Sequence, residues 1–577
     1  MKTIAETCIL MLSCILVYSG DRVHALSYDY SATTECLADP QRTHFGGGII
    51  VNPEFNQGTK GWTVFGQGAI KEGTSERGNK FIMACSRTQS LDSFSQKVQL
   101  EKGKLYSFSA WVQISEGSET VLAVFETPDG KLIHGGKVVA KHGCWSLLKG
   151  GLVANFTGLV QILLESKNTK VEIWADNVSL QSFTEEQWRL HQDKSIEKVR
   201  KRKVRFQLIY ANKTSMEGAI VSIKQIKSGF PFGCGMNHYI LKDTDYRKWF
   251  LSRFKFTTFT NEMKWYSTEI KQGQENYTIA DAMVKFAKQN GISIRAHNIF
   301  WDNPKKQPQW VKTLSPGELR KAAAKRMNSV TSRYAGKLIA WDVVNENLHF
   351  RFFEDKLGEN ASAEFYKKAY QLDPNTTMFM NEYNTIESAG DEKANAFQYK
   401  KKLKEILSYP GNSAVSLGIG LQGHFDYEQP NIAYMRSSLD ILGSMKLPIW
   451  LTEVDVKAGP NQPKYLEEVL REAYSHPAVQ GIITFAGPKS AGFNEMPLVD
   501  NDYKNTAAGD VVDKLLAEWK SSTLEIVASS TGFSELSLFH GDYSVTVKNP
   551  VTNTLTSVNF KVTNDLPQGT FQVQIDL

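Results

Sequence analysis

Between residues 230 and 520, short apolar runs alternate with segments whose apolar residues fall on one helical face. Helical periodicity is clearest at 317–334 and 462–474. The apolar runs have the length and character of strands in a parallel sheet that is covered on both faces. Eight strand–helix units in this order predict an α/β fold, a (β/α)8 TIM barrel. The predicted strands lie at 232–236, 256–260, 292–296, 338–344, 377–380, 417–421, 449–452 and 481–485.

Residues 45–183 follow a different pattern, because short alternating runs are separated by turn residues such as Pro128-Asp129-Gly130. This pattern predicts a β-sandwich of the jelly-roll type. We predict that residues 184–229 are a linker and lead-in to a catalytic barrel at 230–520. Residues 521–577 are again β-rich, and this short C-terminal extension either packs on the barrel or forms a small sandwich. The sandwich runs lie at 80–84, 105–112, 120–125 and 160–164.

The N-terminus has the pattern of a secretory signal peptide. Lys2 precedes an apolar stretch at 9–18 that is too short to span a membrane, and Val23-His24-Ala25 offers a cleavage site. We therefore predict that residues 1–25 are removed and that the protein is secreted to the extracellular space and cell wall, with no membrane partner. Six Asn-x-Ser/Thr sequons are candidate glycan sites: Asn155, Asn177, Asn212, Asn276, Asn360 and Asn375.

The net charge and the spacing of the cysteines limit the nucleic acid partners, zinc sites and disulfides that we expect. A net charge of +6 over 577 residues is too weak to indicate a nucleic acid partner. We interpret the basic run at 198–205 as the solvated end of a helix followed by a strand. Beyond the signal peptide, Cys36, Cys85, Cys144 and Cys234 fit no zinc motif, and one disulfide is plausible, for example between Cys85 and Cys144. The oligomeric state stays open.

Two glutamates lie at the ends of two predicted strands. The apolar run before Asn345 ends in Glu346, and the run 448–452 ends in Glu453. Parallel barrel strands deliver their C-terminal residues to one face, where such enzymes carry their chemistry. A pair of carboxyl groups at that face is what glycoside hydrolysis needs, one to protonate the leaving oxygen and one to attack the sugar.

Other polar and aromatic residues follow the remaining strands in the same way: Asn261, Glu262, Lys264, His297, Trp301, Asn381, Tyr383, Asn384, Gln422, His424 and Asp455. They form the motifs NEMKW, AHNIFW, WDVVNE, NEYN, GLQGH and TEVDV in that order along the chain. Over about 232–520 this series resembles glycoside hydrolase family 10, the endo-β-1,4-xylanases.

The resemblance implies roles for most of these residues in retaining cleavage of xylan. Glu346 would be the acid/base and Glu453 the nucleophile, and Asn345 would bind the sugar 2-hydroxyl. His424, supported by Asp455, would hydrogen-bond the nucleophile. The other implied substrate-binding residues are Asn261, Glu262, Lys264, His297, Trp301, Tyr383 and Gln422. The implied chemistry uses no metal and no cofactor.

The N-terminal module resembles a carbohydrate-binding module of family 22. The resemblance rests on Asn52-Pro53-Glu54-Phe55, on Gly61-Trp62 and on the closing run 173–180. It implies a module that binds xylan or another β-glucan. The aromatic candidates for stacking on a polysaccharide are Trp62, Tyr106, Trp111 and Trp145.

One departure from the family leaves alternatives open. Family members usually carry Trp on and after strand eight, whereas this chain has Phe485 followed by Ala486-Gly487-Pro488, as in the plant branch. Weaker stacking there would favour transfer of the sugar to another sugar. The alternatives are thus a xylan transglycosylase, a non-catalytic xylan-binding wall protein, and a barrel cellulase or mannanase, although the last would lack the NEMKW and GLQGH motifs.

Overall fold

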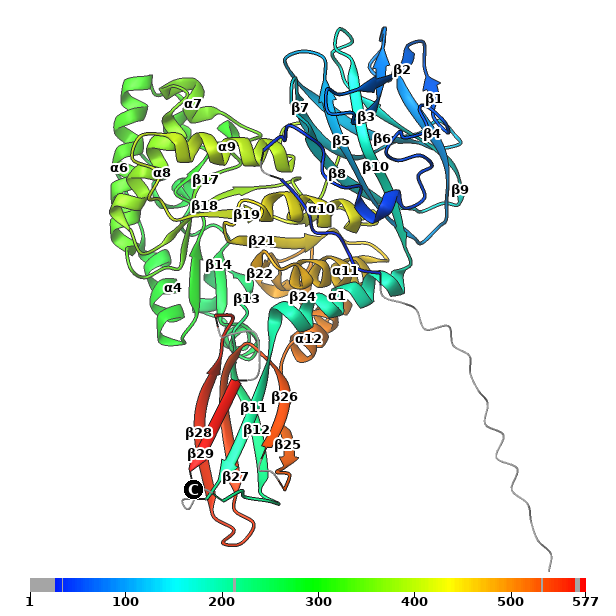
Figure 1. Ribbon diagram of the computed structural model, residues 1–577. Coiled ribbons are helices and arrows are strands. Elements are labelled where there is room, and N and C mark those ends of the chain that lie inside the picture. The colour runs from blue at the N-terminus through cyan, green and yellow to red at the C-terminus, as the bar shows by residue number, and fades with distance from the viewer. Residues whose placement is uncertain (1–25, 34, 211–213, 531–532, 566–570, 577) are drawn as a thin grey trace, which may run out of the picture.

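The computed structural model describes residues 26–33, 35–210, 214–530, 533–565 and 571–576. The predicted signal peptide and the sequon at Asn212 lie outside these residues. Three units are visible in Figure 1: a β-rich module, a barrel of strands and helices, and an elongated β-rich unit at the other end of the molecule. No helix in the described part of the chain is both long enough and apolar enough to cross a membrane.

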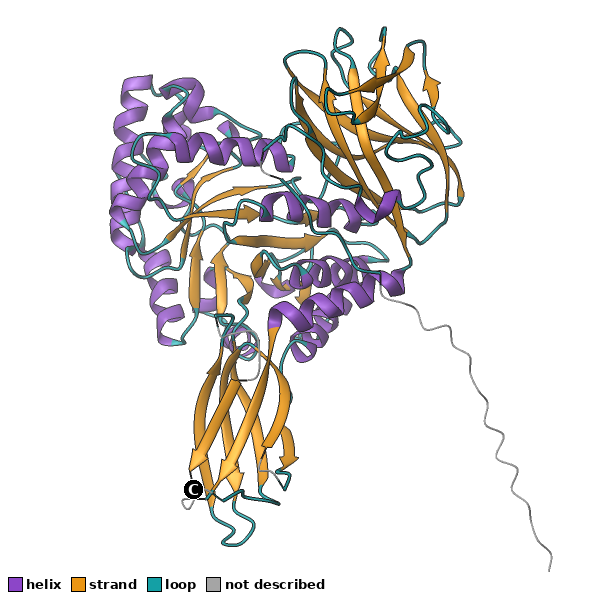
Figure 2. Cartoon of the chain, viewed as in Figure 1, coloured by secondary structure: helices purple, strands orange, loops and turns teal. Residues whose placement is uncertain are grey.

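The central unit is a closed barrel of eight parallel strands surrounded by helices (Figure 2), which confirms the predicted fold class. Each strand pairs with the next in chain order, and the eighth pairs with the first. The strands are β13 (Phe232–Met236), β14 (Phe256–Phe259), β15 (Ser293–Ala296), β17 (Ala340–Asn345), β18 (Thr377–Glu382), β19 (Leu417–Leu421), β21 (Ile449–Val456) and β22 (Val479–Thr484).

The barrel helices begin and end at polar signals in the sequence. In α6, Ser315 accepts from the N–H of Glu318, whose side chain bonds back to Ser315, a capping box that satisfies free N–H groups. The covering helices include α2 (Thr244–Leu251), α4 (Thr278–Gln289), α6 (Pro316–Tyr334), α8 (Ala361–Leu372), α9 (Ala396–Ser408), α10 (Ile432–Gly443), α11 (Gln462–Ser475) and α12 (Ala507–Glu518).

The N-terminal module is a sandwich of two five-stranded antiparallel sheets, as predicted. Its aromatic candidates, however, are all buried: Trp62, Tyr106, Trp111 and Trp145 are each no more than 5% exposed. They fill cores, so the prediction that they stack on a polysaccharide is wrong.

One sheet of the N-terminal module contains β1 (Thr63–Phe65), β4 (Ser93–Leu100), β9 (Gly158–Glu165), β6 (Ser118–Glu126) and β7 (Leu132–Lys141). The other contains β2 (Ala69–Thr74), β3 (Lys80–Cys85), β10 (Ile173–Phe183), β5 (Leu105–Ile114) and β8 (Ser146–Val153).

The segment 184–229, predicted as a linker, contains helix α1 (Glu185–Arg200) and two strands that pair with the C-terminal extension. In β11 (Lys201–Ile209), alternate residues Val204, Phe206 and Leu208 are buried against that extension. The third unit is therefore a small sandwich assembled from both ends of the barrel sequence. Its other strands are β12 (Ile220–Ser228), β25 (Leu524–Val527), β26 (Phe533–Phe539), β27 (Gly541–Lys548), β28 (Leu555–Val562) and β29 (Phe571–Asp576).

The disulfide joins Cys36 to Cys144, with 5.5 Å between their Cα atoms, so the suggested pairing of Cys85 with Cys144 is wrong. The reason is that the segment 26–44 runs back along the module. Leu37 exchanges backbone hydrogen bonds with Trp145, which brings Cys36 beside Cys144. Cys85 is buried and free, as is Cys234 of β13.

The module is docked on the barrel, chiefly through β8 on α10. At the centre of this seam, Lys149 Nζ of β8 lies 2.7 Å from Asp440 Oδ2 of α10, and both side chains are almost fully buried. Tyr28 donates a second hydrogen bond to Asp440 from the N-terminal segment. Because a buried pair needs fixed geometry, this seam defines one orientation of module and barrel.

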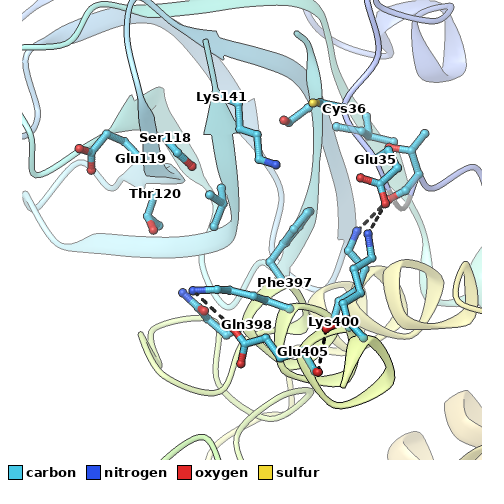
Figure 3. A pocket seen from close by; sticks show the side chains of 17 residues that line it. Glu35, Cys36, Ser118, Glu119, Thr120, Lys141, Phe397, Gln398, Lys400 and Glu405 are labelled. Carbon is cyan, nitrogen blue, oxygen red and sulfur yellow. Dashed lines mark hydrogen bonds and ion pairs between the residues drawn. The ribbon is translucent and has the colours of Figure 1, made fainter. Parts of the chain in front are cut away.

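A cavity of about 670 Å³ lies at the seam between α9, β6, β7 and the N-terminal segment (Figure 3). Its α9 lysines already have partners in the protein. Lys400 Nζ donates to the carbonyl of Thr33, Lys404 pairs with Glu35, and Lys401 lies 3.9 Å from Glu405. The cavity therefore belongs to the docking of the two units, and the polar strand ends lie elsewhere.

Candidate active site

The two predicted carboxyl groups meet at the C-terminal ends of the barrel strands. Glu453 is part of β21, and Glu346 follows the last residue of β17. The N–H of Glu346 donates to the carbonyl of Asn381 on β18 at 2.9 Å, and its φ of 61° lies in the left-handed region that few side chains adopt. Glu346 and Glu453 are 7% and 5% exposed. Two buried carboxyl groups thus line one polar site.

A network of side-chain amides connects these carboxyl groups. Asn381 Nδ2 donates to Glu453 Oε1 at 2.8 Å and to Asn345 Oδ1 at 2.9 Å. Gln422 Nε2 lies 3.4 Å from both Asn345 Oδ1 and Glu346 Oε1. The central role of Asn381 was not predicted; its place in the NEYN motif was the only signal for it.

The partners of Glu453 stabilise its ionised form. His424 Nε2 lies 3.7 Å from one carboxyl oxygen and His297 Nδ1 lies 3.8 Å from the other. Burial alone would raise the pKa of Glu453, but His297, His424 and Lys264 together hold this pKa well below its usual range. His424 also bonds Asp455 at 2.8 Å, and the two carboxylates raise the pKa of His424 although burial opposes this. His424 is therefore hydrogen-bonded to Asp455 and lies at ion-pair distance from Glu453.

Glu346 has the opposite environment. Burial raises the pKa of this carboxyl group, and the charge of Glu453 acts in the same direction. Trp301 and Gln422 lower the pKa only in part, so it stays above its usual range. Two neighbouring carboxyl groups with pKa values shifted apart are suited to act as an acid and an ionised nucleophile.

Two buried donors at this site have no hydrogen-bond partner among the described residues, Asn345 Nδ2 and Trp301 Nε1. The indole nitrogen is close enough to Glu346 to affect its pKa but does not complete a hydrogen bond in this geometry. Unpaired buried donors are costly unless a ligand satisfies them. Both are therefore suited to bind hydroxyl groups of a sugar.

The residues of the NEMKW motif line the β14 side of the site. Lys264 Nζ lies 4.5 Å from the centre of the Trp301 ring and 3.4 Å from Asn261 Oδ1, and burial lowers its pKa to about 8. Glu262 accepts hydrogen bonds from the backbone N–H and ring of His238. These contacts hold charged and amide groups beside an aromatic ring, an arrangement suited to sugar hydroxyls.

Tyr383 lies apart from this group, on the β18 side. Its ring stacks on His349 with 3.8 Å between centroids and 9° between planes. Burial raises the pKa of the Tyr383 phenol, and the charge of Glu346 contributes next. His349, which was not predicted, bonds Glu382 at 2.7 Å and Asp391 at 3.0 Å.

The aromatic residue that follows strand β22 also belongs to the site. The ring of Phe485 meets His424 edge to face, with 6.0 Å between centroids. Phe485 thus occupies the region where the sequence suggested that a Trp was missing.

Comparison with known proteins shows the family of the chain. Residues 222–512 match glycosyl hydrolase family 10, and residues 47–157 match a carbohydrate binding domain. The chain belongs to glycosyl hydrolase family 10. It is 48% identical to "Endo-1,4-beta-xylanase 5-like" of Arabidopsis thaliana over 97% of this chain and 96% of that protein, and 45% identical to "Endo-1,4-beta-xylanase 4" over 96% and 95%. Xylanase 10B of Thermotoga petrophila, solved with xylobiose, is 23% identical over 50% of this chain and 94% of that one, with a TM-score of 0.45.

Several buried polar residues of the family 10 barrel were missed by the sequence reasoning. Asp342 of β17 bonds His297 at 2.8 Å and also pairs with Arg295, so it fixes the ring that faces Glu453. Glu387 accepts from the N–H groups of Gly423 and His424 at 2.8 and 3.1 Å. Both residues lie behind the site residues. Asp342 lies within the predicted strand 338–344 and the WDVVNE motif, which could have indicated its burial, whereas Glu387 lies outside the predicted strands and the quoted motifs.

Proposed function

We propose that the protein is a retaining endo-1,4-β-xylanase of the plant cell wall. The observation that carries the proposal is the opposite shift of the pKa values of Glu346 and Glu453 within one hydrogen-bonded site. The similarity to relatives named endo-1,4-beta-xylanase supports xylan as the substrate.

The proposed reaction has two steps. In the first, a Glu453 oxygen attacks the anomeric carbon while Glu346 gives its proton to the glycosidic oxygen, so the leaving sugar departs and a covalent glycosyl-enzyme forms. In the second, the Glu346 carboxylate takes a proton from water, whose oxygen attacks the same carbon and releases Glu453. Asn345 Nδ2, held by Asn381, would bind the 2-hydroxyl in both steps.

The N-terminal module would bind xylan as a member of carbohydrate-binding family 22. The match to a carbohydrate binding domain supports a sugar ligand. Since the four stacking candidates are buried, contacts to the polysaccharide would come from other residues. Affinity electrophoresis of the isolated module in xylan, compared with a mixed-linkage β-glucan, tests the ligand.

Secretion and glycosylation are part of the same proposal. A mature protein beginning at Leu26, found by N-terminal sequencing of protein secreted from plant cells, would support removal of 1–25. Asn177 is a poor glycan acceptor, because its Nδ2 donates to the carbonyl of Gln41 at 2.5 Å. Peptide mapping should therefore find it unmodified.

Reducing-sugar release and product sizing on glucuronoarabinoxylan test the enzyme, with Glu346→Ala and Glu453→Ala as matched variants. Short xylo-oligosaccharides released by the wild type and lost in both variants would support hydrolysis. Products longer than an oligosaccharide substrate would instead identify a transglycosylase, which the presence of Phe485 in place of Trp favours. Binding without any product in the wild type would exclude both enzymes.

A further inference from the structure

A loop of the barrel lies between the catalytic site and the carbohydrate-binding module. The loop follows β18 and spans residues 384–395. Lys137 of module strand β7 donates from Nζ to the carbonyl oxygen of Asp391 at 2.7 Å, and Lys137 is only 4% exposed. Beside this contact, Lys167 of the module pairs with Glu392, but both of those side chains are largely exposed. The buried contact between Lys137 and Asp391 therefore depends more strictly than the exposed pair on how the module and the loop are positioned.

The same Asp391 bonds the barrel through its side chain. Its carboxylate accepts from the N–H groups of Lys393 and Ala394 at 2.8 and 3.0 Å and from Asn384 at 2.9 Å. Its Oδ2 also lies 3.0 Å from His349 Nε2. A shift of the Asp391 backbone would therefore also shift the Asp391 carboxylate to which His349 is bonded.

His349 connects the loop to the catalytic site. It lies three residues after Glu346, and its Nδ1 bonds the buried Glu382 at 2.7 Å. Although burial opposes it, the two carboxylates raise the pKa of His349 to about 9, so the ring is a cation at neutral pH. Tyr383 stacks on that ring at 3.8 Å.

Tyr383 belongs to the acid side of the site. Tyr383 directly follows β18, which pairs with β17, the strand that ends just before Glu346, and its ring stacks on His349, three residues after Glu346. After burial, the charge of Glu346 also raises the pKa of the Tyr383 phenol. Under the proposed function, Glu346 protonates the oxygen of the leaving sugar. The Tyr383 side is then where sugars beyond the cleaved bond would lie.

We infer that Lys137 is a positioning residue of the active site: through Asp391 and His349 it fixes Tyr383 and so controls binding of the leaving-group sugars. The carbohydrate-binding module is then a structural part of the catalytic site as well as a polysaccharide anchor. This inference rests on the proposed xylanase function.

The test compares two soluble substrates in the full-length protein. Xylohexaose places sugars on both sides of the cleaved bond, whereas an aryl β-xylobioside has no sugar on the leaving side. For Lys137→Met we expect kcat/KM for xylohexaose to fall about 10-fold, mainly through KM, because a charged hydrogen bond is lost. The aryl substrate should change less than about 2-fold. Lys167→Met, the matched control in the module, also contacts this loop and should leave both substrates within about 2-fold, since it breaks an exposed pair.

A second variant changes the next contact of the series, between the Asp391 carboxylate and His349. Asp391→Asn weakens the bond to His349 and should show the same dependence on substrate, and the double variant Lys137→Met/Asp391→Asn should lose less than the product of the two single losses. Equal losses on both substrates, or no loss on either, in variants with wild-type unfolding temperatures would overturn the inference. A wild type that cleaves neither substrate would overturn the proposed function instead.

Discussion

Replacing Asn381 with alanine tests whether the amide network sets the ionisation of the nucleophile. Asn381 is fully buried and donates to Glu453 at 2.8 Å and to Asn345 at 2.9 Å. A hydrogen bond to an ionised acceptor contributes about 1.5–3 kcal/mol. At about 1.4 kcal/mol per pKa unit, its loss should raise the pKa of Glu453 by roughly one to two units.

The direction of the effect on the pH profile follows from the chemistry. Glu453 must be ionised to attack, so activity is lost as pH falls through its pKa, and a raised pKa moves the acidic limb of kcat/KM to higher pH. Asn345 also loses the bond that orients it, so we expect kcat to fall about 10–100-fold. Initial rates with an aryl β-xylobioside across the acidic and neutral range measure both effects.

Asn412→Ala is the matched control. Asn412 is equally buried, and its Nδ2 donates to the carbonyls of Ala363 and Ile406 at 2.9 and 2.8 Å, before β19 and away from the site. Both variants should unfold at lower temperature, but only Asn381→Ala should shift the acidic limb. An unchanged limb in folded Asn381→Ala protein, or an equal shift in both variants, would refute the reasoning.

Four further predictions concern the seam, the disulfide and Phe485. Lys149→Met should destabilise the protein by about 3–5 kcal/mol in chemical denaturation by leaving a buried charge, and Lys149→Met/Asp440→Leu should recover most of this. Because the pKa of Asp440 is lowered from 3.8 to about 2, its contribution to wild-type stability should be present above pH 4 and lost as pH falls to about 2. Non-reducing peptide mapping should recover Cys36 linked to Cys144, and Cys36→Ser should cost about 2–4 kcal/mol of unfolding free energy. Phe485→Trp should raise the ratio of hydrolysis to transfer, measured by sizing the products from xylohexaose.

The barrel could be predicted from the sequence because its signals are local. Each strand is a short apolar run, and each active-site residue directly follows or ends one, so the fold itself brings Glu346, Glu453 and His424 together. The small third unit could not be predicted in this way. Its strands β11 and β26 are separated by more than 300 residues that include the whole barrel, and neither strand carries information about its partner.

The other differences between the predicted and the observed structure also arise because contacts between distant parts of the chain leave no local sequence pattern. The position of Cys36 depends on how the segment 26–44 returns along the module, which no periodicity records. Trp62 and Trp145 were candidates for stacking because aromatic residues serve both cores and sugar sites, and only burial separates the two roles. The bond of Lys137 to a backbone carbonyl of another unit has no sequence signature at all.

Burial does not explain why the two glutamates differ. Glu346 and Glu453 are similarly buried, and burial raises the pKa of each of them. The difference arises because His297, His424 and Lys264 all lower the pKa of Glu453, whereas the charge of Glu453 raises the pKa of Glu346. Ionising Glu453 therefore keeps the proton on Glu346, so a single asymmetry of charge prepares both the nucleophile and the acid.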